Sequence, residues 1–217
     1  MTDEVLDVQH RGDGVVVATL NRPDKRNALN EAMRQAIVEA LRGFAADDDV
    51  KCVVICGSGG TFCAGFDLDE LMAADDTGQL FAHATAYHHV VHTFDKPLVA
   101  AIEGSAVAGG MDLALMCDLR IGAADARFGQ PQVKFGVPAA FELITTVVAE
   151  PVARELCLTG RIIDADEAKE IGLVHRLVEA GGALDAAVEL AREISAVAGA
   201  TAMKHAFVAA QPELFAS

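Results

Sequence analysis

Two glycine-rich segments, residues 61–68 and 104–112, constrain this chain most strongly because each follows an apolar, strand-like run. Their small residues let a ligand approach the main chain. A helix is expected to begin just after each segment, and a helix N-terminus offers free N–H donors and a partial positive charge. Such donors suit an oxygen atom that gains negative charge during a reaction. The first segment matches neither the G-x-G-x-x-G nor the Walker pattern, so it does not indicate a standard phosphate-binding loop.

Short apolar runs alternate with helical patterns along the rest of the chain. Strands are expected within residues 5–20, around a turn at Gly12-Asp13-Gly14, and at residues 50–56, 98–102 and 119–123. Helices are expected at residues 30–46 with Asn30 as N-cap, at 80–94, 110–117 and 139–158, and over most of 164–205. This order predicts an α/β fold with largely covered sheets.

The composition argues against several partners. The 217 residues carry a formal net charge of −15, from 17 basic and 32 acidic residues. Nucleic acids and anionic membranes both favour a basic surface, so neither is an expected partner. No apolar run approaches the ~20 residues that span a bilayer. The start Met1-Thr2-Asp3-Glu4 is acidic where a signal peptide is basic. We therefore expect a cytoplasmic protein.

Cysteines and histidines are the candidate metal ligands, and their spacing does not indicate a metal site. Cys52 and Cys56 share one face of an apolar strand, and no second pair or adjacent histidine completes a zinc site. The five cysteines are expected to be small buried hydrophobes, with a catalytic thiol as the alternative. His88 and His92 share a helix face, but no H-E-x-x-H pattern accompanies them. Hydrogen-bonded or solvated histidines are expected, and a histidine base is the alternative.

Taken in order, the motifs of this chain resemble those of the enoyl-CoA hydratase/isomerase family, also called the crotonase family, from residue 15 to about residue 178. The matching motifs are Asn21-Arg22-Pro23, Asn27-Ala28-Leu29, Phe62-Cys63-Ala64-Gly65-Phe66-Asp67-Leu68, Asp95-Lys96-Pro97, Ala108-Gly109-Gly110-Met111-Asp112, Cys117-Asp118, Phe128-Gly129-Gln130-Pro131, Leu158-Thr159-Gly160-Arg161 and Gly172-Leu173-Val174. The resemblance implies a crotonase-like spiral of ββα units over residues 1–163. A C-terminal helical region, shorter than usual for the family, would follow over residues 164–217. It also implies assembly as a homotrimer or hexamer.

The same resemblance implies a site for acyl-CoA thioesters. The backbone N–H groups of Phe66 and Gly109 would stabilise the oxyanion that forms on the thioester oxygen. Residues matching the family's coenzyme A contacts are Arg26, Ala28, Ala64, Asp67 and Leu68. An ordinary exposed arginine is the alternative for Arg26. No cofactor is expected beyond the coenzyme A that belongs to the substrate, and no metal.

The acid/base positions depart from the family pattern. Family hydratases use two glutamates, and the matching positions here hold Asp112 and Gln132. Asp112 is shorter by one methylene, roughly 1.5 Å of reach. Gln132 can orient water or substrate but does not transfer protons in ordinary catalysis. Glu103 and Glu142 are alternative acids. The competing interpretation of Glu103 is a polar residue at the end of a strand, and that of Glu142 is a solvated carboxylate at the start of a helix.

The sequence therefore predicts an enzyme that hydrates or isomerises an enoyl-CoA, with Asp112 as the main acid/base. With a single carboxylate, isomerisation is easier to explain than hydration, because one group can move the proton. A second hypothesis is an acyl-CoA-binding or regulatory protein that has kept the oxyanion site and lost the chemistry. Thioester hydrolysis and decarboxylation are further alternatives within the family, because these reactions use the same oxyanion site.

Overall fold

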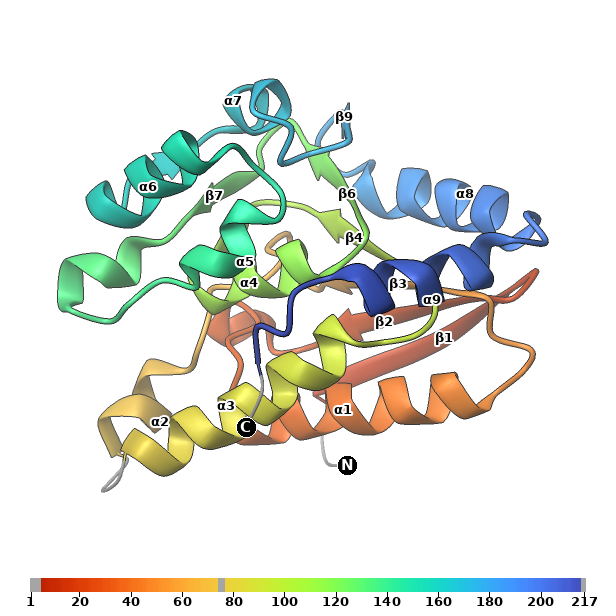
Figure 1. Ribbon diagram of the computed structural model, residues 1–217, viewed down its shortest axis with the longest axis horizontal. Coiled ribbons are helices and arrows are strands. Elements are labelled where there is room, and N and C mark those ends of the chain that lie inside the picture. The colour runs from red at the N-terminus through yellow and green to blue at the C-terminus, as the bar shows by residue number, and fades with distance from the viewer. Residues whose placement is uncertain (1–4, 74–76, 216–217) are drawn as a thin grey trace.

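The computed structural model describes residues 5–73 and 77–215, and its centre is a six-stranded sheet in the order β1-β2-β3-β4-β6-β9 (Figure 1). These strands are β1 (Leu6–Gly12), β2 (Val15–Leu20), β3 (Cys52–Gly57), β4 (Leu98–Ile102), β6 (Leu119–Ala123) and β9 (Arg176–Val178). The β1 and β2 strands form an antiparallel hairpin, and every later neighbour pair is parallel. The predicted α/β class is confirmed.

The two faces of this sheet are buried under different helices, which lie on opposite sides of it in Figure 1. Alternate residues of β2 and β3, such as Val17 and Val54, pack against α8 (Ala183–Ser195). The intervening residues, such as Val53, share a core with α1 (Glu31–Ala46), α3 (Thr77–His92) and α4 (Gly109–Met116). Burial on both faces explains why these strands are apolar at nearly every position.

A smaller sheet lies beside the first and carries the second glycine-rich segment. It contains β5 (Ser105–Val107), β7 (Arg127–Gly129) and β8 (Ile162–Ile163), in the order β5-β7-β8. A parallel bridge joins Cys63 to Ala106 of β5, so the first glycine-rich segment runs alongside the second. The fold therefore brings together two segments that are about forty residues apart in the sequence.

The helix expected at residues 139–158 is wrong as a single element. The chain forms α5 (Phe141–Thr145) and α6 (Glu150–Thr159), with a break between them. Pro151 lies in the first turn of α6, where its missing N–H does no harm. A proline inside a continuous helix would clash with the carbonyl four residues earlier.

The C-terminal part of the chain contributes to the main sheet. The helices α7 (Ala165–Glu170), α8 and α9 (Ala200–Ala210) occupy much of it, and β9 pairs with β6. The domain boundary at residue 163 stays a prediction. Among the described residues, no helix combines the length and the apolar character needed to cross a membrane.

Local signals explain where the first helix begins. The Asn30 side chain accepts a hydrogen bond from the Met33 N–H at 3.0 Å, as an N-cap does. Short 3-10 helices, η1 (Pro23–Lys25) and η2 (Pro131–Phe135), and the helix α2 (Leu68–Ala73) complete the elements near the candidate site.

Candidate functional site

The two glycine-rich segments meet at Phe66 and Gly109. A Cβ placed on Gly109 would lie 3.5 Å from the Phe66 backbone nitrogen and 2.8 Å from its ring. A Cβ placed on Gly65 would lie 3.1 Å from the Gly109 nitrogen. The two backbone nitrogens singled out by the sequence therefore belong to segments in direct contact.

These two N–H groups are left unused by the described part of the chain. Within residues 5–73 and 77–215, neither the Phe66 nor the Gly109 N–H donates a hydrogen bond. Ala108 adopts φ 51° and ψ −130°, a strained conformation for a residue with a side chain, and α4 begins immediately after it. The pair offers one free donor at the N-terminus of α4 and a second from the adjacent segment, which is suited to an oxygen bearing negative charge.

Glycine at position 110 is a steric requirement. A Cβ there would lie 2.2 Å from the Cys63 carbonyl oxygen, closer than any real contact allows. The close approach of α4 to the first segment thus depends on the paired glycines that the sequence motif contains.

Asp112 lies in the first turn of α4, three residues after Gly109. Its side chain is buried, and its Oδ1 accepts a hydrogen bond from Gln130 Nε2 at 2.8 Å. Burial raises the pKa of Asp112 to about 7, and the hydrogen bond from Gln130 opposes that rise. A carboxyl group with this pKa exchanges a proton readily near neutral pH.

Gln132 is connected to Asp112 through Gln130. The Gln132 Nε2 donates to Gln130 Oε1 at 2.5 Å, while Gln132 Oε1 is buried and has no hydrogen-bond partner among the described residues. Sequence reasoning assigned no role to Gln130, although this residue belongs to the matched motif. Its complete burial is the feature that marks it, since glutamine is seldom fully buried.

The residues expected to contact coenzyme A come from two loops that the fold joins. The Ala64 N–H donates to the Arg26 carbonyl oxygen at 3.0 Å, and Ala28 is buried beside them. Arg26 and Leu68 are exposed, and Leu68 has 66% of its surface accessible. All of the expected residues thus lie around one region next to Phe66.

Asp67 is already paired within the protein. Its Oδ2 accepts from the Arg22 guanidinium at 2.8 Å, and its Oδ1 accepts from the Asp69 N–H. Burial acts to raise the pKa of Asp67, but the hydrogen bond and charge of Arg22 outweigh it and lower the pKa below its ordinary value. The carboxylate therefore braces the loop, and the Asp67 backbone is also paired, with its N–H donating to the Leu29 carbonyl oxygen at 3.4 Å.

The alternative acids do not join the site. The Glu103 carboxylate accepts hydrogen bonds from the Gly181 and Ala183 N–H groups, at 2.9 and 2.8 Å, and so caps the start of α8. Reading Glu103 as a second pocket acid is therefore wrong. Glu142 is exposed in the first turn of α5, where a solvated carboxylate is expected.

The histidines on α3 contact aromatic rings. His88 lies between Phe66 and Phe215, with ring centroids 5.9 and 5.0 Å away, and His92 packs against Phe215 at 5.5 Å. Burial lowers the pKa of His88 to about 4, so its ring is neutral at physiological pH. Within the described part of the chain, no group of His, Cys, Asp or Glu side chains could hold a metal ion.

The cysteines behave as hydrophobes. Cys52, Cys56, Cys63 and Cys117 are buried. Burial raises the pKa of the Cys52, Cys63 and Cys117 thiols to about 12. Because the thiolate is the nucleophile, these thiols are unreactive near neutral pH, and the alternative of a catalytic thiol is not supported.

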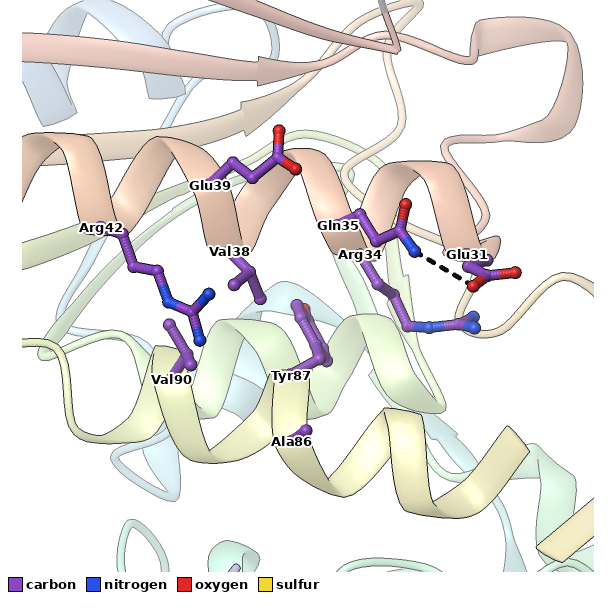
Figure 2. A pocket seen from close by; sticks show the side chains of 9 residues that line it. All are labelled: Glu31, Arg34, Gln35, Val38, Glu39, Arg42, Ala86, Tyr87 and Val90. Atoms are coloured by element: carbon purple, nitrogen blue, oxygen red, sulfur yellow. Dashed lines mark hydrogen bonds between the residues drawn. The ribbon is translucent and has the colours of Figure 1, made fainter. Parts of the chain in front are cut away.

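A surface hollow of about 420 Å³ lies between α1 and α3, and Figure 2 shows its lining side chains. Asp112 is not among the residues that line it. Arg34, on its inner side, pairs with Glu70 at 2.9 Å and lies 5.4 Å above the Phe66 ring. The hollow therefore adjoins the site through Arg34, whose guanidinium contacts the Phe66 ring.

Known proteins are similar to this chain over most of its length. The family described as enoyl-CoA hydratase/isomerase matches residues 10–214. A Thermus thermophilus protein described as a candidate enoyl-CoA hydratase is 41% identical over 195 residues, covering 87% of this chain and 77% of that protein. The 2,3-dehydroadipyl-CoA hydratase of Escherichia coli is 33% identical over 198 residues, covering 90% of this chain and 76% of that enzyme.

Solved structures extend the agreement to three dimensions. The crystal structure of an enoyl-CoA hydratase from Mycobacterium smegmatis matches this chain with a TM-score of 0.88 and 35% sequence identity, covering 94% of this chain and 82% of that one. The crotonase-like fold expected from the motifs is confirmed. The chain belongs to the enoyl-CoA hydratase/isomerase family.

Proposed function

We propose that this protein hydrates an enoyl-CoA thioester, with the thioester oxygen bound by the Phe66 and Gly109 N–H groups and with Asp112 as the acid/base. The observation that carries the proposal is the buried Asp112 carboxyl, with a pKa of about 7, on the same helix whose first N–H is free. Relatives named as hydratases favour hydration over thioester hydrolysis or decarboxylation.

The two N–H groups supply the main electrostatic stabilisation in this proposal. Attack at the β-carbon, or removal of an α-proton, moves negative charge onto the thioester oxygen. Each preorganised donor is worth roughly 3–4 kcal/mol toward such a charge. Phe66 N–H and Gly109 N–H have no acceptor among the described residues. No existing hydrogen bond therefore has to be broken at either donor before the substrate binds.

Coenzyme A binds in this proposal along the loops of Arg26, Ala28, Ala64, Asp67 and Leu68. Exposed Arg26 and Leu68 would contact the nucleotide part, while Ala64 allows close approach to the backbone. Asp67 shapes this loop rather than offering a free carboxylate, since its carboxylate is committed to Arg22. The coenzyme enters with the substrate, so no resident cofactor or metal is proposed. We also propose assembly as homotrimers or hexamers, which light scattering of the purified protein would test.

Double-bond isomerisation is the second candidate. It is favoured by the single carboxylate, because one group that moves a proton between two carbons suffices for it. An acyl-CoA-binding protein without activity is not favoured, because the relatives are named as enzymes.

The test is turnover of a short 2-enoyl-CoA and of its 3-enoyl isomer, followed by the absorbance of the conjugated enoyl thioester. Loss of signal from the 2-enoyl compound indicates hydration, and a gain from the 3-enoyl compound indicates isomerisation. Asp112→Asn should lower kcat by about 10²- to 10⁴-fold. Asp48→Asn, an exposed aspartate on a distant turn, is the matched control. Equal rates in the wild type and Asp112→Asn would contradict the proposal.

A further inference from the structure

The peptide group that carries the Phe66 N–H is oriented by Leu29. The Leu29 N–H donates to the Gly65 carbonyl oxygen at 2.8 Å, and a parallel bridge joins Leu29 to Phe66. The Gly65 carbonyl and the Phe66 N–H belong to one planar trans peptide, so they point in opposite directions. Because the carbonyl faces Leu29, the Phe66 N–H points away from Leu29 and stays a free donor.

Arg34 holds Leu29 by its carbonyl oxygen. The Arg34 Nη1 donates to this oxygen at 2.7 Å, whereas the Asp67 N–H donates to the same oxygen at 3.4 Å. A hydrogen bond from a charged donor is roughly twice as strong as one between neutral groups. Arg34 is therefore the stronger partner of this carbonyl, and it restrains Leu29 relative to the Phe66 peptide.

The same guanidinium contacts the Phe66 side chain. The Arg34 Cζ lies 5.4 Å from the centroid of the Phe66 ring, within the range of a cation–π contact. The His88 ring meets the Phe66 ring edge-on, with 5.9 Å between the centroids. Arg34 thus acts on Phe66 in two ways, through the main chain by way of Leu29 and through the ring.

Glu70 of α2 fixes the plane of the Arg34 guanidinium. Nη1 and Nη2 of Arg34 donate to the two carboxylate oxygens of Glu70 at 2.9 and 3.1 Å. The Arg34 side chain is buried, and it reaches back toward Glu31 at the start of α1 (Figure 2). A buried cation is costly unless it is paired. A planar guanidinium with several donors can serve a carbonyl, a carboxylate and an aromatic ring at once, which a lysine cannot.

We infer that Arg34 is a positioning residue for the oxyanion site, which fixes the direction of the Phe66 N–H through the Leu29 carbonyl and the Phe66 ring. This inference rests on the proposed function and adds to it a residue on α1 that acts only through Leu29 and Phe66. A misdirected N–H weakens the hydrogen bond to an oxyanion, and so it affects the transition state more than the binding of coenzyme A.

The probe for the test is butanoyl-CoA labelled with ¹³C at the thioester carbonyl, whose resonance moves downfield when the oxygen accepts hydrogen bonds. We would measure the resonance of the bound probe and the exchange of its α-protons in D₂O. Calorimetry gives the Kd of free coenzyme A, which has no thioester oxygen. Arg34→Met removes the charge and the donors, whereas Arg34→Lys keeps the charge. Arg42→Met is the matched control, because Arg42 is exposed on the same helix and lines the same hollow.

We expect the wild type to shift the carbonyl resonance downfield, and Arg34→Met to lose most of that shift. Arg34→Met should also lower kcat for α-proton exchange by about 10- to 100-fold, the order of loss caused by misplacing a catalytic group by about 1 Å. The Kd of free coenzyme A should stay close to the wild-type value. Arg34→Lys should fall between the two, because an ammonium can donate to Leu29 but has no plane to stack on the ring. Arg42→Met should match the wild type.

A double variant separates lost positioning from an unpaired charge. Arg34→Met combined with Glu70→Gln removes the carboxylate that Arg34→Met leaves without its partner. The double variant should behave as Arg34→Met does in all three measurements. If both methionine variants fail to fold, Arg34→Lys supplies the comparison, and wild-type values for its resonance and its exchange rate would contradict the inference.

A wild-type carbonyl shift and exchange rate in Arg34→Met would overturn the inference. The same holds if the Kd of free coenzyme A rises by the factor by which exchange falls, because that result would indicate a general loosening of the loop. A wild type that binds butanoyl-CoA without shifting its carbonyl resonance, or that exchanges no α-protons, would instead count against the proposed function itself.

Discussion

The candidate site has a backbone half and a side-chain half, and they differ in how the fold specifies them. The Phe66 and Gly109 N–H groups are positioned by main-chain geometry, including the positive φ of Ala108. Asp112, Gln130 and Gln132 are positioned by side-chain hydrogen bonds within a buried chain. The first half tolerates almost no change in residue size, whereas the second depends on the chemistry of three polar side chains.

This difference teaches that the charge-stabilising half of the site rests on packing, whereas the acid/base half rests on side-chain chemistry. The backbone donors depend on close packing, so altering them should damage the structure itself. The side-chain groups can be exchanged at smaller cost to stability, so their effects should appear mainly in rate and pH dependence.

The largest expected effect on folding comes from the backbone half. Gly110→Ala should destabilise the protein by about 3–5 kcal/mol, because the new Cβ would collide with the Cys63 carbonyl. Gly43→Ala, in the exposed part of α1 where a Cβ meets nothing within 4 Å, should stabilise by up to about 1 kcal/mol. Urea denaturation measures both variants, and similar stabilities for the two would contradict the packing argument.

The side-chain half should make the stability of the folded protein depend on pH. Burial holds the pKa of Asp112 at about 7 in the folded protein, above its ordinary value of 3.8. The folded state therefore binds this proton more tightly, and the corresponding stability is lost as the pH rises through about 7. Relative to Asp112→Asn, the wild type should lose on the order of 1–3 kcal/mol of stability from about pH 4 to about pH 8.

Thermal unfolding of both proteins across this pH range provides the measurement. A constant difference between them would mean that Asp112 is not a buried titrating group. Asp48→Asn should keep a constant difference from the wild type, because the Asp48 side chain is exposed.

The smallest expected effect lies outside both halves. Glu103→Ala should destabilise the protein by about 1–2 kcal/mol, because Gly181 and Ala183 lose their acceptor at the start of α8. Activity per folded molecule should stay at the wild-type level. Glu142→Ala, at the exposed start of α5, should change stability by less than about 0.5 kcal/mol. A large loss of turnover in Glu103→Ala with unchanged stability would restore its reading as a pocket acid.

The backbone half could be predicted from sequence because glycine patterns report on main-chain geometry. The pairing of residues 61–68 with 104–112 required the family resemblance, since nothing local indicates that the two segments meet. The N-cap of α1 at Asn30 was predicted from residue type and confirmed. The break between α5 and α6 was missed, although Pro151 is a local signal for a helix start.

The side-chain half could be predicted only in part. Asp112 and Gln132 were found by their motif positions, but burial and hydrogen-bond direction depend on tertiary contacts. Gln130 acquires its role from two partners that lie on either side of it in space. Glu103 was left open for the same reason, because its partners on the loop before α8 are about eighty residues away.

The most direct test of the account is the pH dependence of α-proton exchange in a saturated acyl-CoA, measured by proton NMR in D₂O. This reaction requires the two N–H donors and the base, and it does not depend on whether the natural reaction is hydration or isomerisation. For the wild type, the account predicts exchange that rises with pH around an apparent pKa of about 7, and a loss of at least about 100-fold in Asp112→Asn. Exchange at the wild-type rate in Asp112→Asn would contradict it.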